Sequence, residues 1–560
     1  MKKQLVFLSL GAAMMVLGGC SKKLGQFSSD YFSTNPTPLE TVGENVPATI
    51  TGNIPAKFMQ KNAKVTATPV LTWSNGSANG QPVTVQGENV RANGQVISYQ
   101  NGGTVTIPFN VAYEPGMDES ELFLDFAVDQ NGKLYTLPRV KVGNGVIATS
   151  TLASAATVTP AQSKSNYERI IKETYAAEIK FLINQANIRA NQTDKSDYID
   201  LNKQLKEANA APDKEIAGIT IHSYASPDGS LEFNTELAEH REQNTVNYME
   251  KQLKKDKITE FGELTSSFTP EDWEGFQSLV EKSNIQDKEL ILSVLKMYKD
   301  PEERERELRH LASVFDELAD QILPALRYSK VVATINVIGK SDAEMNQLFD
   351  TDPKALNADE LLYLATLTND KTRRLAIYKK ACELYPKDYR TFNNLGMTAY
   401  ELGNYEAAKQ AFSQAASLAP NNKEVEMNLG LVNLLEGNYA KAGELLGGAA
   451  GVPEAGPALG TYYLTQGEVN KARAAFGNAK TNNAGLAQIL SNDYSAAKST
   501  LDAVADKDAT TYYLLAVLGA RTNNESMVLS NLREAIRLKP SMKEKAADDL
   551  EFANFNLGSL

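Results

Sequence analysis

The chain has 560 residues, a formal net charge of −12 at pH 7, 2 cysteines and 3 histidines. An acidic balance of this size argues against nucleic-acid binding and against an extended basic face for membranes. So few cysteines and histidines, with no HExxH or GxSxG motif, leave little material for metal or catalytic-triad chemistry. We therefore expect no catalytic residue, cofactor or metal. The length alone predicts three or four domains.

Residues 1–19 have the three-part layout of a secretory signal. The apolar run from Leu5 to Leu17 is about 13 residues long, short of the roughly 20 that cross a bilayer. The ending Leu17-Gly18-Gly19-Cys20 resembles the lipobox of bacterial lipoproteins, in which the cysteine takes diacylglycerol and becomes the new N-terminus. That resemblance implies lipidation of Cys20 and a stable outer-membrane anchor. The alternative is an ordinary secretory signal with an incidental cysteine.

Residues 20–44 contain Ser, Thr, Asn and Pro with few large apolar side chains, which predicts a tether. Ser21-Lys22-Lys23 follow the cysteine, so the acidic cluster of exported Bacteroidetes surface lipoproteins is missing. This difference favours the periplasmic side of the outer membrane over the cell surface.

Short β-branched and aromatic runs fill residues 45–150, for example 64–73 and 104–113. Asn-Gly turns, such as Asn131-Gly132, separate them. This alternation predicts an N-terminal β-sandwich, which we interpret as immunoglobulin-like. Residues 151–164 are rich in Thr, Ala, Ser, Val and Pro and indicate a linker.

The segment 165–340 has the pattern of an α/β domain. We expect, in order, a strand at 178–188, a helix at 197–210, a strand at 216–224, a helix at 234–254 and a strand at 326–338. Gly229, Asn234, Leu237 and Arg241 resemble the OmpA-like peptidoglycan-binding domain at that family's spacing. Residues 269–324 are charged and helical, which predicts an insertion like that of expanded OmpA-like domains in Bacteroidetes envelope proteins.

The OmpA-like resemblance implies a site for diaminopimelate, whose ammonium pairs with an Asp and whose carboxylate pairs with an Arg. Arg241 matches the Arg, but the Asp position is Ser226, which supplies no charge. Asp228 can replace it, or the pocket has lost its ligand. The candidate peptidoglycan-binding residues are therefore Ser226, Asp228, Asn234 and Arg241. From the residues alone, Arg241 also fits a solvated helix arginine, and His222 fits a satisfied sheet histidine.

The region 357–560 repeats itself. Ala408 and Ala442 lie 34 residues apart, and Leu395-Gly396 recurs as Leu429-Gly430. The pattern resembles tetratricopeptide repeats, paired helices that stack into a solenoid with a concave, partner-binding face. We expect about five to six repeats up to residue 540 and a capping helix at 541–560. The candidate partner-binding residues are Asn393, Asn394, Thr398, Glu426, Asn433 and Tyr462.

These patterns together predict a multidomain, non-catalytic envelope lipoprotein. It would recruit other envelope proteins through the all-α repeats and contact peptidoglycan through the OmpA-like domain. One alternative is a surface or fimbria-associated adhesin component, which a β-sandwich would suit. The other is a hydrolase in the insertion that uses acidic residues such as Asp272 and Glu274.

Overall fold

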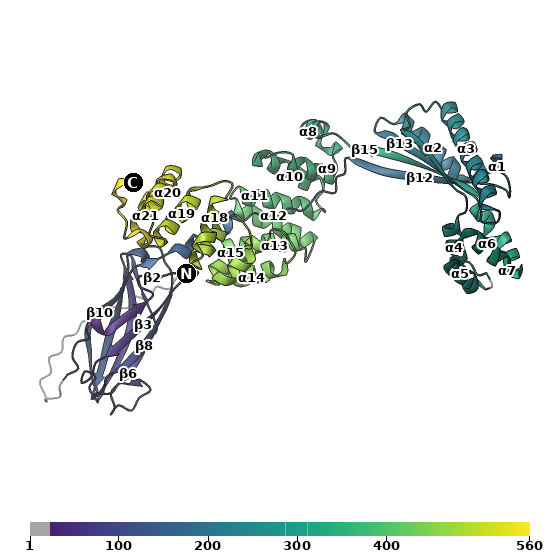
Figure 1. Cartoon of the computed structure of the whole chain (residues 1–560). Coiled ribbons are helices and arrows are strands. Elements are labelled where there is room, and N and C mark those ends of the chain that lie inside the picture. Colours follow the sequence, from purple (N-terminus) through teal and green to yellow (C-terminus); the bar gives the residue numbers. More distant parts are fainter. Residues whose placement is uncertain (1–22, 286, 311) are drawn as a thin grey trace. The chain divides into compact units, whose positions relative to one another are not determined.

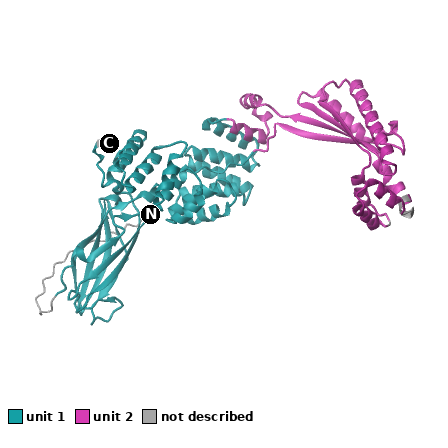
Figure 2. Ribbon diagram, in the orientation of Figure 1, with its two compact units in different colours: residues 1–164, 368–560 teal, residues 165–367 magenta. Residues whose placement is uncertain are grey.

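The computed structural model describes residues 23–285, 287–310 and 312–560 (Figure 1). The signal sequence and Cys20 lie outside the described residues. The chain forms two compact units, of which unit 1 comprises residues 1–164 and 368–560 and unit 2 comprises residues 165–367 (Figure 2). Unit 2 is therefore inserted into the chain of unit 1. Among the described residues, no helix combines the length and the apolar content that crossing a bilayer requires.

The N-terminal part of unit 1 is a β domain in which two sheets enclose one core. Alternate side chains of its strands point inward, so that Ile50 and Ile107 of one sheet and Val65 and Leu124 of the other are buried together. One sheet has the order β1 (Phe32–Asn35), β3 (Asn45–Ile54), β8 (Gly103–Ala112), and the other β10 (Lys133–Asn144), β9 (Glu121–Gln130), β4 (Ala63–Trp73), β6 (Val83–Gln86), β7 (Gln95–Val96), with β5 (Gly76–Asn79) beside β4. The predicted sheet-rich N-terminal region is confirmed. Its immunoglobulin-like topology stays a prediction.

The prediction of a tether reaching residue 44 is wrong for the described part of that segment. Leu24 and Phe27 are buried in the core of the β domain, and β1 pairs with β3. Leu39 lies in β2 (Leu39–Glu40), which runs parallel to β11 (Val146–Ile147). Composition misled the prediction because the few apolar residues of this segment are placed where the sandwich needs them.

Unit 2 contains a four-stranded sheet with the order β12 (Ile170–Lys180), β15 (Tyr328–Ile338), β13 (Lys214–Tyr224), β14 (Glu263–Thr269). Helices α2 (Ser196–Ala210) and α3 (Leu231–Lys255) contact the sheet through apolar side chains such as Leu201 and Met249. The first strand lies eight residues before its predicted start, since 178 − 170 = 8. A loop with one turn at residues 183–184 occupies most of the expected 178–188 run.

Four helices follow the sheet strand β14 and have a small core of their own, which includes Phe276, Ile291 and Leu308. They are α4 (Trp273–Lys282), α5 (Lys288–Met297), α6 (Pro301–His310) and α7 (Ala312–Gln321). This segment corresponds to the predicted helical insertion. Unit 2 ends with α8 (Asp342–Thr351) and α9 (Ala358–Thr366).

The C-terminal part of unit 1 is an array of paired helices. The helices are α10 (Lys371–Leu384), α11 (Tyr389–Glu401), α12 (Tyr405–Leu418), α13 (Lys423–Leu435), α14 (Tyr439–Gly448), α15 (Ala455–Thr465), α16 (Val469–Phe476), α17 (Asn482–Leu490), α18 (Tyr494–Asp502), α19 (Ala509–Arg521) and α20 (Glu525–Leu538). Glycines permit the close crossing within a pair, because a Cβ on Gly396 would lie 2.6 Å from the ring of Phe412. The predicted helical array is confirmed.

The predicted capping helix is shorter than expected. Only α21 (Met542–Asp548) is α-helical, and 3₁₀ turns follow at Leu550–Phe552 and Leu557–Ser559. Phe552 still covers the last pair of helices, with its ring 5.6 Å from that of Tyr513. The first of these turns packs on β11 as well as on α19.

Candidate functional site

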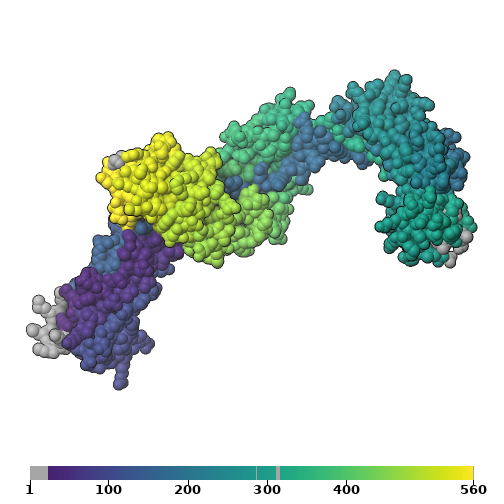
Figure 3. Space-filling model, in the orientation of Figure 1, coloured from purple at the N-terminus to yellow at the C-terminus, as the bar shows by residue number. Residues whose placement is uncertain are grey.

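Residues 153–164, which the sequence predicts to be a linker, run along the first helices of the array, and we call this segment the strap. Figure 3 shows blue atoms of this part of the chain between green atoms of the array. Ala155, Ala161 and Ser163 are at most 6 % exposed. The strap is thus partly buried in unit 1, with exposed residues such as Thr157 and Thr159 between the buried ones.

Three asparagines of the array each hold one strap residue by its backbone. In each clamp the side-chain oxygen accepts the strap N–H, and the side-chain amide donates to the carbonyl of the same residue. The clamps are Asn394 with Ser163 (2.9 and 2.9 Å), Asn428 with Ala161 (2.7 and 2.8 Å) and Asn483 with Ser154 (3.1 and 2.8 Å). An amide side chain has one acceptor and one donor group, which match the two polar groups of a peptide unit.

The clamps occupy the same place in three repeats of the array. They lie on the first helices α11, α13 and α17, and each asparagine precedes the crossing glycine by two residues, as in Asn428 and Gly430. The first helices α15 and α19 carry Ala458 and Leu514 at this position and cannot clamp. Repetition of one motif therefore creates a row of backbone-binding groups.

Further side chains complete the groove around the strap. The Tyr400 hydroxyl donates to the Ala155 carbonyl at 2.7 Å, and the Ser163 hydroxyl donates to the Glu424 carboxylate at 2.5 Å. Burial raises the pKa of Tyr400, and it raises that of Tyr378 to about 12, so both hydroxyls stay protonated near neutral pH. Among the described residues, the side chains that bond to the strap are neutral apart from the Glu424 carboxylate and the Arg390 guanidinium, which donates to the Lys164 carbonyl at 3.5 Å.

Only part of the predicted partner-binding set lines the strap. Asn394 binds it as described, and Asn393 donates to the Ala161 carbonyl at 3.0 Å. The other candidates are engaged inside the array. Thr398 and Asn433 donate to carbonyls of their own helices, Glu426 lies beside Gly448, and the Tyr462 hydroxyl lies beside Gly443.

Asn428 and Asn483 belong to the site but were not predicted. The signal was present in the sequence, because Asn394-Leu-Gly, Asn428-Leu-Gly and Asn483-Ala-Gly repeat one motif. A search for polar residues at a fixed offset from the crossing glycine would have found all three.

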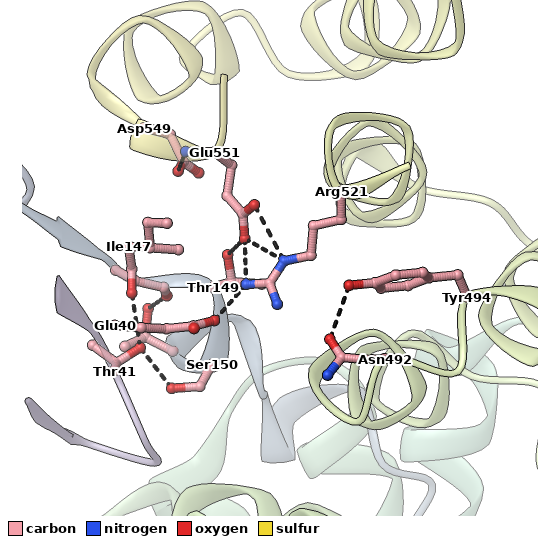
Figure 4. Close-up of polar contacts among 12 residues, drawn as sticks. Glu40, Thr41, Ile147, Thr149, Ser150, Asn492, Tyr494, Arg521, Asp549 and Glu551 are labelled. Atoms are coloured by element: carbon pink, nitrogen blue, oxygen red, sulfur yellow. Dashed lines mark hydrogen bonds and ion pairs between the residues drawn. The ribbon is translucent and has the colours of Figure 1, made fainter. Parts of the chain in front are cut away.

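A polar cluster fixes the β domain to the C-terminal end of the array, where the strap begins (Figure 4). Arg521 donates to Glu551 at 2.6 Å and to Glu40 at 2.5 Å, and the Thr149 hydroxyl donates to Glu551 at 2.6 Å. Burial raises the pKa of the Glu551 carboxyl and is opposed by the charge of Arg521. Ser150 donates to Thr41 at 2.7 Å. The first residues before the strap are therefore held firmly.

In unit 2 the structure brings Ser226 and Asp228 together at the carboxyl end of β13. The Ser226 hydroxyl donates to Asp228 at 2.6 Å. Arg327 donates to Asp228 at 2.8 Å and to the Ser226 oxygen at 3.0 Å. Arg327 was not predicted, although its place at the start of the expected last strand was a signal for it. The Asp228 carboxylate thus has a buried arginine as its partner.

Arg241 is fully buried beneath this cluster, so the interpretation as a solvated helix arginine is wrong. Its guanidinium lies over the Phe181 ring, 5.1 Å from the centroid. Burial and the nearby charge of Arg327 lower its pKa to about 10. It donates to the backbone carbonyls of Tyr224 (2.8 Å), Gln185 (3.0 Å) and Leu182 (3.3 Å). The guanidinium N–H groups of Arg241 are therefore engaged by backbone carbonyls of the domain itself.

The remaining candidates of unit 2 also serve the fold. Asn234 donates to the carbonyl of Gly229 at 3.0 Å, which fixes the turn before α3. The two ring nitrogens of His222 lie 2.6 Å from the Ser267 hydroxyl and 2.7 Å from the Thr269 hydroxyl. Both nitrogens are therefore engaged on the sheet.

Residues 393–457 match the family model of the tetratricopeptide repeat. Among the solved structures that are similar to part of the chain, one is a chain of the APC/C hetero-tetramer Cut9-Hcn1, with 18% identity over 35% of this chain and 42% of that chain and a TM-score of 0.32. Two others are a tetratricopeptide repeat protein from Parabacteroides merdae ATCC 43184 (15% identity, 37% of this chain, 91% of that chain, TM-score 0.30) and Pseudomonas aeruginosa pilF (16% identity, 35% of this chain, 96% of that chain, TM-score 0.29). The match spans 42% of the first of these chains. No curated protein matches. The family match shows that the C-terminal array contains tetratricopeptide repeats.

Proposed function

We propose that this chain is a non-catalytic scaffold of the cell envelope, anchored in the outer membrane through Cys20 and facing the periplasm. Its tetratricopeptide repeats would recruit protein partners, as such repeats generally do. The row of asparagine clamps carries this proposal, because each clamp pairs with the N–H and the carbonyl of one residue. Such groups suit a polypeptide better than a small molecule or a nucleic acid.

The position of the β domain is consistent with a membrane anchor. Leu24 is buried in that domain and lies four residues after Cys20, since 24 − 20 = 4. Four extended residues reach about 14 Å. A lipid on Cys20 would thus hold the β domain close to the bilayer, with the strap and the array following it.

Labelling with radioactive palmitate and membrane fractionation test the anchor. The native chain should take up label and sediment with outer membranes, and the Cys20→Ser variant should do neither. An unlabelled, freely soluble native chain would contradict the proposal. Crosslinking in intact envelopes, followed by recovery of the chain, should identify partners attached to residues of the array.

Contact with peptidoglycan is a second candidate function, which the Asp228–Arg327 pair favours. An amino-acid group such as that of diaminopimelate carries an ammonium and a carboxylate, which complement one Asp and one Arg. Here Asp228 would take the ammonium and Arg327 the carboxylate, whereas Arg241 stays in the fold. The side chains of the pair are 15% and 9% exposed, so a ligand would have to separate them.

Sedimentation with purified sacculi tests this contact. The native chain should sediment and Asp228→Asn should not, while Glu236→Gln on the exposed face of α3 should behave as the native chain. Circular dichroism establishes that the variants are folded. If the native chain stays in the supernatant, wall contact is wrong.

A further inference from the structure

The groove that is built to grip a polypeptide already contains one. We propose that the strap is an exchangeable ligand and that the partner supplies an extended, uncharged segment of small and hydroxyl-bearing residues, which enters the groove by displacing the strap. This inference rests on the proposed recruitment of partners by the array. It adds the chemistry of the partner and the step that admits it.

The clamps recognise backbone, so they admit any segment whose side chains are small enough. Ser154, Ala161 and Ser163 stand at the clamps. The two inner ones, Ala161 and Ser163, are each 1% exposed. A large side chain at either position would collide with the first helices. The spacing of the clamps fixes where a segment must be extended.

The groove also selects against charge. The strap contains no charged residue before its last one, Lys164, which is exposed. The groove residues Asn393, Asn428 and Thr461 are fully buried and neutral, and an unpaired charge placed beside them would lose its hydration. The Glu424 carboxylate accepts a hydroxyl from Ser163, so a Ser or Thr is favoured at that place.

The array has a core that does not depend on the strap. Its helix crossings join residues of the array alone, for example Gly430 with Leu446. The buried apolar residues of the strap are few and small, namely Ala155, Val158, Pro160 and Ala161. Segments held mainly by polar contacts open at lower free energy than a packed core does. The strap can therefore leave while the helices remain stacked.

The structure also suggests where displacement starts. Helix α15 has Ala458 at the clamp position and therefore does not hold the strap by its backbone there. The strap residues Thr157 and Thr159 are exposed. A cavity of about 310 Å³ lies here, lined by these two threonines together with Pro457 and Phe476. An incoming segment can make its first contacts in this gap between the clamps at Asn483 and Asn428.

Fluorescence anisotropy with a labelled peptide of residues 151–166 tests the exchange in the full chain. Ala161→Pro with Ser163→Pro removes two N–H donors from the strap and leaves the groove unchanged. This strap variant should bind the peptide at least about tenfold more tightly than the native chain, whose groove is occupied. Adding Asn394→Ala and Asn428→Ala should abolish binding. A peptide with Glu at 161 and 163 should not bind.

A folded strap variant that fails to bind the peptide would overturn the proposal, as would equal binding of the Glu-containing peptide. Hydrogen exchange in the native chain decides the matter if the strap variant does not fold. Strap amides should exchange at least about 100-fold faster than the slowest amides of α13 and α19. Equal rates would mean that the strap leaves only when the array unfolds. Failure of the Cys20 experiments would leave these results unaffected.

Discussion

Replacing Asn428 with Ala should loosen the strap by an amount that the structure predicts. The side chain accepts the Ala161 N–H at 2.7 Å, donates to the Ala161 carbonyl at 2.8 Å and donates to Asn393 at 2.9 Å. In Asn428→Ala the Ala161 N–H loses its acceptor inside a buried site, whereas its carbonyl keeps the bond from Asn393 at 3.0 Å. An orphaned buried donor costs about 1–3 kcal/mol and a lost hydrogen bond about 1 kcal/mol. The free energy needed to open the strap should therefore fall by about 2–4 kcal/mol.

Hydrogen exchange followed by mass spectrometry measures this change directly. A cost of about 2–4 kcal/mol corresponds to roughly 30- to 700-fold faster exchange of the strap amides, at about 1.4 kcal/mol per factor of ten. Asn433→Ala is the matched control, because Asn433 lies on the same helix and, within the part of the chain that the structure describes, donates only to the Leu429 carbonyl at 2.8 Å. Equal exchange of the strap amides in both variants would refute the clamp.

Three further predictions concern stability, and unfolding in denaturant or heat checks each. Gly430→Ala should lower the free energy of unfolding by about 1–3 kcal/mol because the new Cβ would lie 2.8 Å from the Leu446 side chain. The control Gly447→Ala, whose Cβ would have no described atom within 4 Å, should leave the stability unchanged or raise it slightly. Equal effects of the two substitutions would contradict the tight helix crossing at Gly430. Arg241→Met should lower the free energy of unfolding by about 3 kcal/mol or more because three backbone carbonyls lose their hydrogen-bond donor. The control Gln243→Ala on the same helix should lower it by less than about 0.5 kcal/mol. An Arg241→Met variant as stable as the native chain would refute the structural role of Arg241. Burial raises the pKa of the Asp549 carboxyl, so the folded state binds its proton more tightly than the unfolded state does. The contribution of Asp549 to the stability therefore increases as the pH falls through the raised pKa toward the ordinary value of 3.8. The stability of the native chain relative to Asp549→Asn should rise as the pH is lowered toward about 4, and a constant difference would contradict the burial effect.

Local repetition made the array predictable from the sequence. Each crossing requires a small residue against a large one, as at Gly396 and Phe412, and both lie within one repeat. The strands and helices of unit 2 were likewise visible in their periodicity, for example α3. Their exact ends were not, because the loop after β12 contains Phe181, Leu182 and Ile183 and has the pattern of a strand.

The strap was not predictable in the same way. Ser163 and Asn394 are 231 residues apart, and no local pattern links them. Small, uncharged residues are typical of a flexible linker, yet they are also what a narrow groove admits. For the same reason the segment 24–44 was mistaken for a tether although Leu24 and Leu39 are buried in the β domain. Arg241 matched a family position, but only the fold reveals that carbonyls take its donors.

Occupation of the groove by the strap is the claim on which the account depends, and a photo-crosslinker in place of Gln162 tests it most directly. Gln162 donates to the Tyr378 hydroxyl at 3.3 Å and is only partly buried, so the position should tolerate a benzoylphenylalanine. Irradiation of the full chain should give an intramolecular crosslink to residues 371–401, which contain α10 and α11. Crosslinks to other parts of the chain, or none to these helices, would contradict the account.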